Sequence, residues 1–493
     1  MTARAHLLTS LVAMTTAAGG WSTAFAQSVR VSGVTSFQYV EIRPLITDSV
    51  DVSLVAGDGL FRRAADGHLV RCIEGTAFCR FMRSSHPIST VPATQDVTVS
   101  VWGIGRGIRG YARARGRATV AGEDSLWPRS SDNYDLLAAY AELSRRSWRL
   151  RVGRQWKTSG LGYHNYDGGS VVVWTPTFTF EAFGGWSLAQ GLNEPRTGES
   201  LAALESFAPN VRALLVGTQV SYRPRTGSTF TVLYQREIRH DRAALYTERV
   251  SVDAVTRTDR VSLEGSIEAD VATTTLNEAR LRAWYNPSPN LGLGIYARHY
   301  QPFFELWTIW GSFDPIGFDE IGANAMWRIP GSTTDVDVRG ARRSYQDTGA
   351  SSVFGPVRSS GWYLGINVST RVGRDWQIQG GARRDIGFGA AKNDGYLSLR
   401  RQFDNGTFFG VRLQAYQRLY EFRVAEGTVL GLGGNGAIRV GPRVHLTGAL
   451  TTYRHLAGGS SPSVDWSQLR GSLRIDWTLG SEPAVSGRGG GTR

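Results

Sequence analysis

The stretch Trp466-Ser-Gln-Leu-Arg-Gly-Ser-Leu-Arg-Ile-Asp-Trp-Thr-Leu479 alternates two kinds of side chain. One parity is apolar or small and the other polar or charged: Leu469, Gly471, Leu473, Ile475 and Trp477 against Arg470, Ser472, Arg474 and Asp476. Because successive side chains of a β-strand point to opposite faces, this stretch predicts a strand with one apolar face. Such a strand suits a soluble sheet over a core, or a transmembrane barrel whose apolar face contacts lipid.

The same alternation recurs in about 22 segments between Val29 and Thr478. The links between these segments belong to two classes that alternate along the chain. Every second link is short, such as Gly105-Arg106, Ser147, Gly373-Arg374 and Gly441-Pro442. The other set holds all the long links: 43–95, 121–134, 157–169, 187–210, 301–318, 346–360 and 455–465.

This sorting of link lengths decides between the two folds. Outer-membrane barrels have short periplasmic turns and longer external loops, whereas a soluble sandwich has no reason to sort its loops. The sequence therefore predicts an all-β fold, a transmembrane antiparallel up-and-down barrel of about 22 strands (about 20–24). No plug domain is expected, because the segment 43–95 is short for that role.

Composition agrees with a single large barrel. The chain has 493 residues, 20% charged and 41% hydrophobic. No apolar run of about 18 residues follows the N-terminus, which excludes transmembrane helices. The formal charge is +13, and removing residues 1–26, which contain Arg4 and no acid, leaves +12. Nearly all of this cationic charge is arginine, since Lys157 and Lys392 are the only lysines.

The two ends of the chain are expected to lie outside the barrel. Arg4, the apolar stretch 7–18 and the small residues of Ala24-Phe25-Ala26 predict a signal peptide, 1–26, cleaved before Gln27. Export then places the barrel, 27–479, in an outer membrane. The Gly-rich tail 480–493 is expected to be disordered.

The chain has two cysteines, Cys72 and Cys79, both within the long external loop 43–95. An even number of cysteines in an exported protein predicts a disulfide. A zinc site is not expected, because no second pair of Cys or His lies at ligand spacing.

Tryptophans lie near the ends of the expected strands. Trp148 and Trp156 share a parity and bracket one strand about 26 Å long, which is close to the height of an apolar band between two aromatic girdles.

With these features, the chain resembles Gram-negative outer-membrane β-barrels of the porin type. The resemblance rests on the signal, the hairpin meander and Leu150-Arg-Val-Gly-Arg-Gln155 followed by Tyr166-Asp-Gly-Gly169. Porins commonly show a strand ending in Gly-Arg-Gln, then a loop, then Asp-Gly opening the next strand. One departure is that such barrels usually end in Phe, whereas here Trp477 lies well before the terminus.

Arginines are concentrated on the parity expected to face the lumen. They outnumber the inward acids, and in a water-filled pore this excess would favour anions. The alternative is interstrand ion pairing that only solvates the wall. The expected lumen and selectivity residues are Arg109, Arg113, Arg115, Arg117, Arg149, Arg151, Arg280, Arg282, Arg298, Arg339, Arg412, Arg470 and Arg474.

The external link 301–318 is unusually aromatic. It could fold inward as a constriction or stack a flat ligand, and the alternative is a self-packed loop that caps the rim. The residues concerned are Phe303, Phe304, Trp307, Trp310 and Asp314.

Enzymatic chemistry is not expected. His240-Asp241, His299 and His445 are not spaced for a nucleophile and its base. No catalytic residue, metal or cofactor is assigned, and nucleic acid is no sensible partner for an exported barrel.

The function predicted is a porin-like outer-membrane channel for passive diffusion of small, anionic solutes, with lipid as its surroundings. The alternative is a structural sheath or conduit that holds a partner protein, such as an electron-transfer cytochrome, in its lumen.

Overall fold

The structure is a computed structural model. It describes residues 28–43, 45–57, 62–65, 70–73, 75–122, 134–188, 213–224, 227–239, 245–301, 317–346, 359–387, 391–420, 427–457 and 465–480. The expected signal peptide 1–26 lies outside this described part of the chain, as do residues 481–493 of the expected tail.

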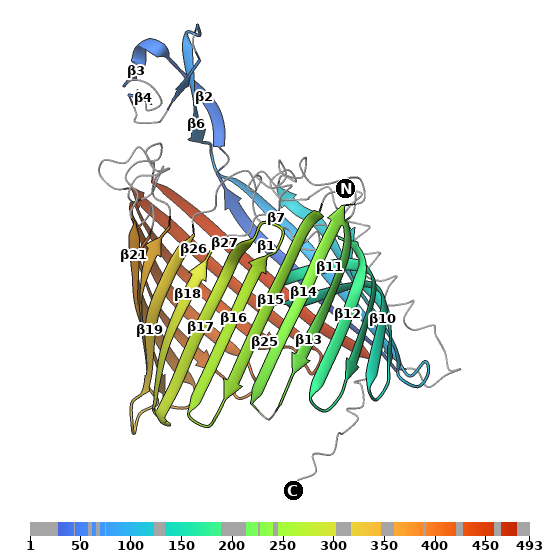
Figure 1. Cartoon of the computed structure of the whole chain (residues 1–493). Helices are drawn as coiled ribbons and strands as arrows, with labels where there is room; N and C mark the ends of the chain where they lie inside the picture. The colour runs from blue at the N-terminus through green and yellow to red at the C-terminus, as the bar shows by residue number, and fades with distance from the viewer. Residues whose placement is uncertain are drawn as a thin grey trace.

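The described strands form a closed antiparallel barrel of 22 strands (Figure 1). The barrel closes where β1 (Ser28–Ile42) pairs with β27 (Trp466–Gly480) on one side and β7 (Ile88–Trp102) on the other. The remaining wall strands follow in chain order: β8 (Ile108–Gly122), β9 (Tyr134–Ser144), β10 (Trp148–Ser159), β11 (Gly162–Trp174), β12 (Phe178–Ser187), β13 (Ala213–Tyr222), β14 (Ser228–Arg239), β15 (Leu245–Arg257), β16 (Val261–Asp270), β17 (Thr275–Ser288), β18 (Leu291–Tyr300), β19 (Phe318–Arg328), β20 (Asp335–Tyr345), β21 (Ser360–Val372), β22 (Trp376–Ile386), β23 (Ala391–Gln402), β24 (Phe408–Tyr420), β25 (Gly427–Arg439) and β26 (Val444–Ala457).

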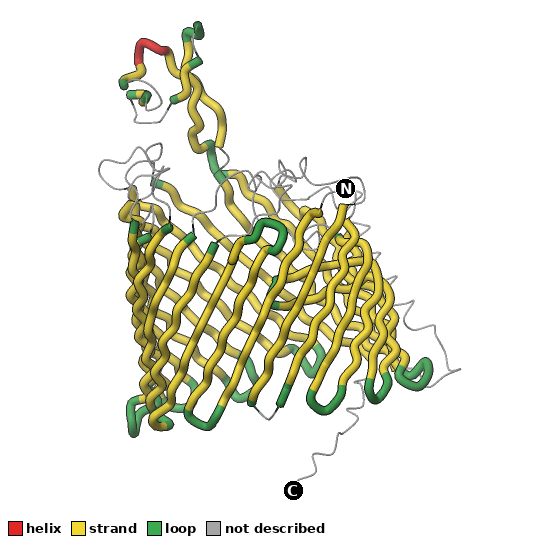
Figure 2. Tube along the Cα trace, viewed as in Figure 1, coloured by secondary structure: helices red, strands yellow, loops and turns green. Residues whose placement is uncertain are grey.

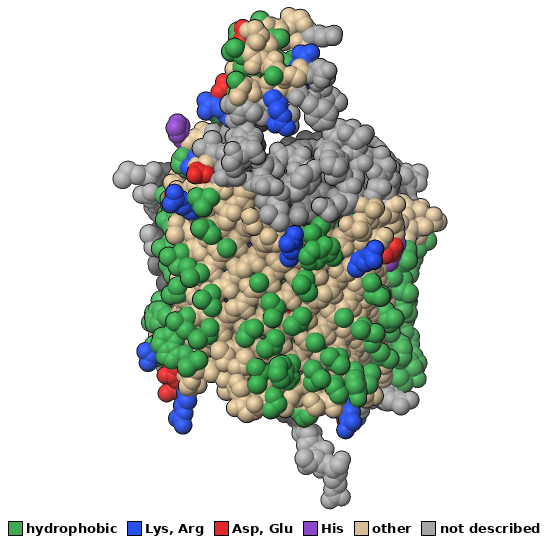
Figure 3. Space-filling view, turned by 90° about the vertical axis from the view of Figure 1, so that its left-hand side faces the viewer, with side chains coloured by type: hydrophobic (Ala, Val, Ile, Leu, Met, Phe, Trp, Pro, Cys, Tyr) green, Lys and Arg blue, Asp and Glu red, His purple; other side chains and the backbone are tan. Residues whose placement is uncertain are grey.

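The predicted porin-type outer-membrane barrel architecture is thereby confirmed. Alternation places large apolar side chains on the outside of the wall: Leu281, Ile295 and Ile321 are 61%, 65% and 67% exposed. Figure 3 shows hydrophobic side chains as a belt across the face of the barrel that is turned to the viewer, with cationic side chains near the upper and lower edges of this belt. Such a band matches the lipid-facing surface of a transmembrane barrel. None of the described residues forms a helix long and apolar enough to cross a bilayer.

Short turns join the strands at one end of the barrel, shown as green loops at the bottom of Figure 2. Several of them place a glycine at positive φ, for example Gly373 at φ 65° and Gly406 at φ 81°. Residues with a side chain rarely adopt this conformation, so glycine suits these tight turns. The longer links lie at the other end, as expected.

A smaller β structure rises above the loop end, between β1 and β7 (Figure 1). β2 (Leu45–Asp51), β6 (Phe78–Ser84) and β5 (Arg71–Cys72) form one sheet, and β3 (Val55–Ala56) and β4 (Arg63–Ala64) pair separately, with a 3₁₀ turn at Val52–Leu54. Cys72 and Cys79 lie opposite each other in β5 and β6 and form the predicted disulfide. Ala64, Val70 and Phe81 pack beside it as a small apolar core.

The structure differs from the predicted boundaries in two places. β7 begins at Ile88, eight residues before the expected Asp96, because its pairing with β1 continues to Ile88. Its pairing with β8 passes Pro92 through a bulge. The segment 157–169 is not a long loop: β10 extends to Ser159, and β11 begins at Gly162 after a two-residue turn. This hairpin matters for the lumen.

Candidate functional site

The inner face of the wall follows directly from the strand alternation. In β10, Leu150 and Val152 are 39% and 56% exposed on the lipid side, so Arg149 and Arg151 lie on the opposite face. The same alternation puts all thirteen arginines named from the sequence on the inner face, on β8, β10, β17, β18, β20, β24 and β27.

Three arginines of β8 contact acids on the neighbouring strands. Arg113 Nη2 donates to Asp96 Oδ2 at 2.6 Å, and Arg115 Nε donates to Asp96 Oδ1 at 2.6 Å. Arg117, only 4% exposed, reaches Asp135 at 3.3 Å. The Asp96 carboxylate therefore contacts two guanidinium groups. Arg117 is too buried to contact a solute in the lumen.

Five further arginines from the set are also paired. Arg151 lies 2.7 Å from Glu142, and Glu278 accepts from both Arg280 and Arg298. Such pairs, whether across strands or within one, solvate the wall and fix the side chains, and each contributes little to stability when exposed. The remaining two pairs are Arg339 with Asp337 and Arg474 with Asp476, both at 2.7 Å.

The other five arginines have no carboxylate within ion-pair distance among the described residues: Arg109, Arg149, Arg282, Arg412 and Arg470. Two of them lie over aromatic rings, Arg412 at 4.4 Å from the Tyr396 centroid and Arg470 at 5.6 Å from that of Tyr453. A guanidinium on a ring keeps its charge and its donors, so these groups remain able to bind an anion.

The largest departure from a plain barrel begins at Gly153. β10 pairs with β9 only as far as Arg154, which lies opposite Ala139, although β9 continues to Tyr134. Gly153 has φ 127°, and a Cβ there would lie 2.2 Å from the Ala139 carbonyl oxygen. Glycine thus lets β10 leave its neighbour. Arg154 holds the bend, donating to Asp167 at 2.7 Å and to the Leu136 carbonyl at 2.9 Å.

Beyond this bend, the β10–β11 hairpin folds onto the inner wall, behind β14 and β15 in Figure 1. At its tip, Arg249 Nη1 of β15 donates to the Leu161 carbonyl at 3.1 Å. Gln235 Nε2 of β14 lies 3.1 Å from His164 Nδ1. A Cβ at Gly160 would lie 2.7 Å from Ser251 Oγ, so a larger residue would have to displace the Ser251 side chain for the tip to lie this close to β15.

An apolar cluster anchors the hairpin to the wall. Leu161 and Tyr166 of the hairpin are buried with Phe183, Leu215 and Leu233 of β12, β13 and β14. Leu161 is 2% exposed and Leu215 is fully buried. Burying such side chains inside a barrel that is otherwise polar is a strong reason for the hairpin to stay in place.

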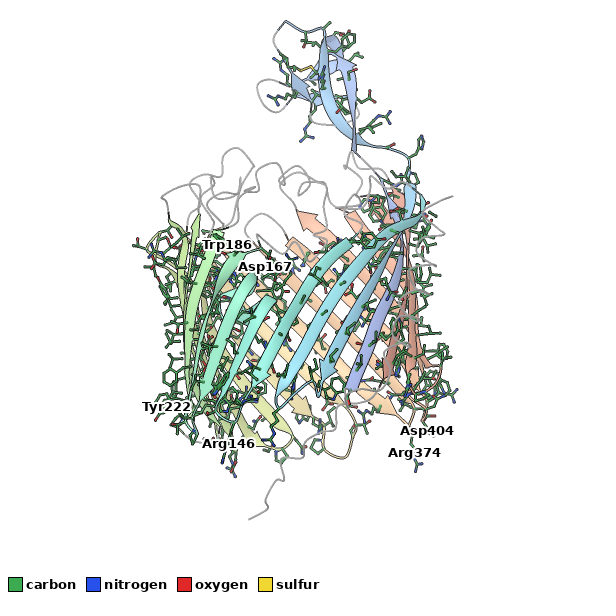
Figure 4. All side chains as sticks on the ribbon, turned by 90° about the vertical axis from the view of Figure 1, so that its right-hand side faces the viewer. Arg146, Asp167, Trp186, Tyr222, Arg374 and Asp404 are labelled. Carbon is green, nitrogen blue, oxygen red and sulfur yellow. A yellow bond between two sulfur atoms is a disulfide. The ribbon has the colours of Figure 1, made fainter. Side chains whose placement is uncertain are left out.

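Buried polar contacts complete this anchor. Lys157 Nζ lies 2.9 Å from Glu181 Oε2, with 7% of the lysine side chain exposed, and Ser170 Oγ donates to Gln155 Oε1 at 2.8 Å. Figure 4 places Asp167 and Trp186 at the loop end of the wall, opposite the turn end with Arg146 and Tyr222. The hairpin therefore narrows the loop half of the lumen from one side.

The prediction that Trp156 belongs to an aromatic girdle is wrong. Its ring lies 5.7 Å from Tyr111 and 6.3 Å from Tyr140, whose own rings stack at 5.1 Å. Arg151 lies over Tyr140 on the same inner face, so Trp156 packs inside the barrel. The cause is the bend at Gly153, which turns the second half of β10 inward.

Sequence analysis did not identify this hairpin as part of the site. A signal was available, because Gly160 and Gly162 flank one leucine between two alternating segments, a pattern typical of a tight turn. The porin-like motif residues are in fact paired in register, Gly153 with Gly168, Arg154 with Asp167 and Gln155 with Tyr166. Residues 302–316, including the aromatic candidates Phe303 to Asp314, lie outside the described part.

No group of three or more metal-ligating side chains occurs among the described residues. The described inner face presents a passage that the hairpin narrows, with paired and unpaired guanidinium groups on its wall.

Comparisons with known proteins give a likeness of architecture. No protein-family model and no curated protein sequence matches this chain. Among solved structures, OccAB2 of Acinetobacter baumannii has a TM-score of 0.43 at 10% identity, covering 94% of this chain and all of that one. OccK3 (OpdO) of Pseudomonas aeruginosa has 0.40 at 10% identity, covering 93% of this chain and 96% of that one. Similarity this low indicates no function for this chain.

Proposed function

We propose that this chain is an outer-membrane channel, not an enzyme, through which small anionic solutes diffuse passively. In this proposal, the signal peptide is removed before Gln27 and the barrel sits in membrane lipid. The selectivity residues are those predicted from the sequence. The observation that carries the proposal is the named set of thirteen inner-face guanidinium groups: eight share six carboxylate partners, and five have none among the described residues.

Charge excess in a water-filled passage between low-dielectric walls raises the local anion concentration. Guanidinium groups remain charged at any relevant pH and bind carboxylate or phosphate through paired hydrogen bonds. Conduction also requires release, and several weak sites serve this better than one tight site. The unpaired groups, Arg109, Arg149, Arg282, Arg412 and Arg470, lie on different strands and so supply such weak sites.

The β10–β11 hairpin supports a channel more than a sheath. It covers the inner faces of β12 to β15 and is anchored there by the cluster around Leu161. A partner protein in the lumen would have to share its space with this hairpin, whereas small solutes would pass beside it.

Single-channel recording of purified protein in planar lipid bilayers tests the proposal. The channel predicts stable, discrete conductance steps from protein that contains no haem or other bound chain. Failure to conduct, together with co-purification of a stoichiometric partner protein, would replace the channel by the sheath.

A further inference from the structure

A groove of about 720 Å³ crosses the lipid-facing wall between β15 and β20. Small residues form the floor of the groove: Ala254 and Gly265, which lie opposite each other, and Ala297, which lies opposite Leu281. Leu281 and Ile321, 61% and 67% exposed, stand out beside them. A hollow with an apolar lining on the membrane side of a barrel is suited to an acyl chain.

The groove ends at a cation. Ile321 lies opposite Arg342 in β20, and Arg342 lines the groove and lies opposite Trp362 in β21. Arg342 has the same parity in β20 as Val338, which is 39% exposed, so both point to the lipid side. From the other side, the Arg384 guanidinium lies 5.4 Å from the centre of the Trp362 ring.

These two arginines are not neutralised by the described residues. No described carboxylate lies within ion-pair distance of Arg342 or Arg384. Two acids line the groove, and both are engaged: Asp319 at 2.8 Å by His299, and Glu320 by Arg343. Ser344 adds a hydroxyl beside Arg342. The apolar groove therefore leads to two unpaired positive charges on either side of an indole ring.

The height of Arg342 and Arg384 on the wall decides whether they face acyl chains or lipid headgroups. β20 ends at Tyr345 and β22 ends at Ile386, both at the loop end of the barrel. Figure 3 shows cationic side chains at the upper edge of the hydrophobic belt and none in its middle. An arginine on the lipid face is costly at the midplane and nearly free near the interface, where it reaches the headgroups.

We propose that this groove binds a phosphorylated membrane lipid of the leaflet on the loop side. The lipid phosphate bridges Arg342 and Arg384 across Trp362, and one acyl chain lies along the groove over Ala254, Gly265 and Ala297. Phosphate is the expected headgroup chemistry because two guanidinium forks match its oxygens. The site is independent of the proposed channel function and requires only that the barrel spans a membrane.

Native mass spectrometry of the full barrel with lipid A as the probe tests this site. We expect the double variant Arg342→Gln/Arg384→Gln to bind lipid A about tenfold or more weakly than the parent. The matched control is Arg401→Gln: Arg401 lies 5.4 Å from the Trp376 ring at the opposite, short-turn end of the wall. This control should bind like the parent.

A second variant blocks the groove and leaves both charges. A Cβ at Gly265 would lie 3.7 Å from the nearest neighbouring atom, the Arg280 carbonyl oxygen, so Gly265→Leu fits the backbone and fills the hollow. It should also weaken lipid A binding, while heat-modifiable gel mobility verifies folding of each variant. Equal binding of dephosphorylated lipid A, equal competition by a fatty acid, or unchanged binding in both variants would each overturn the proposal.

Discussion

At the scale of single residues, Gly168 and Gly169 differ in the space that each leaves for a side chain. A Cβ at Gly168 would lie 2.0 Å from the Gly184 carbonyl oxygen, whereas one at Gly169 meets nothing closer than 3.5 Å. We expect Gly168→Ala to lower the free energy of unfolding by about 1–3 kcal/mol, because backbone must move. Urea titration in detergent micelles, followed by tryptophan fluorescence, measures this change.

Gly169→Ala is the matched control, and its free energy of unfolding should stay within about 0.5 kcal/mol of the parent. Equal destabilisation by the two substitutions would contradict the close approach of β11 and β12 that the structure places beside the hairpin bend.

Asp96 forms ion pairs with two arginines of β8 and so offsets part of their positive charge. Asp96→Asn removes the carboxylate shared by Arg113 and Arg115, which adds one positive charge to the lumen. We expect a higher ratio of chloride to potassium permeability, because the wall then carries one more net positive charge to attract anions. The ratio follows from the zero-current potential at low ionic strength, where screening is weak.

Asp48→Asn makes the same change of charge outside the barrel, on the external sheet. Asp48 is ionised at neutral pH, because the hydrogen bond from Arg83 lowers its pKa. The permeability ratio of this control should match the parent. An equal rise in both variants would place the selectivity at the external mouth instead of the wall.

Residue positions on the inner face could be predicted from the sequence, since alternation alone places Arg113, Arg151 or Arg474 opposite apolar neighbours. The pairing of arginines with acids on other strands could not be predicted: Asp96 lies 17 residues from Arg113 in the chain, and the contact depends on register. This is why Arg117 was expected to face solutes and instead lies buried against Asp135.

At the scale of elements, the β10–β11 hairpin is the part that sets the width of the lumen. Joining Gln155 to Tyr166 through Asn-Gly would remove its inner half, since these two residues are already paired and such a turn closes antiparallel strands. We expect a larger single-channel conductance, because the tip no longer covers β12 to β15. Unchanged conductance would mean that solutes do not pass the hairpin.

Fixing the hairpin in place gives the complementary experiment. A Cβ at Gly160 would lie 3.1 Å from Ser251 Cβ, close to the spacing of about 3.5–4.5 Å in disulfides. The oxidised Gly160→Cys/Ser251→Cys variant should conduct like its reduced form. A lower conductance after oxidation would show that the hairpin leaves this position on the wall in the conducting channel.

The inward hairpin also marks the limit of what periodicity reveals. Alternation of polar and apolar side chains is the same in a wall strand and in a strand folded onto the wall, so β10 and β11 gave no sign of the bend. Only glycines such as Gly153 and Gly160, which permit close approach, distinguish the two, and their role appears once the neighbouring strands are placed.

At the scale of the whole molecule, strand number, order and the two ends of the barrel follow from patterns that span the chain. Every expected wall strand is present, because lipid on one side and water on the other impose the alternation on each of them. The pairing of β1 with β27 follows from the same alternation, because a barrel must close. The disulfide between Cys72 and Cys79 follows from an even number of cysteines in a chain expected to be exported.

The zero-current potential of the parent protein across a potassium chloride gradient tests the central claim most directly. An excess of unpaired arginines on the inner face predicts the sign of a chloride-preferring pore, with a preference that fades near 1 M salt, where the Debye length is about 3 Å. The opposite sign, that of a potassium-preferring pore, would contradict the account.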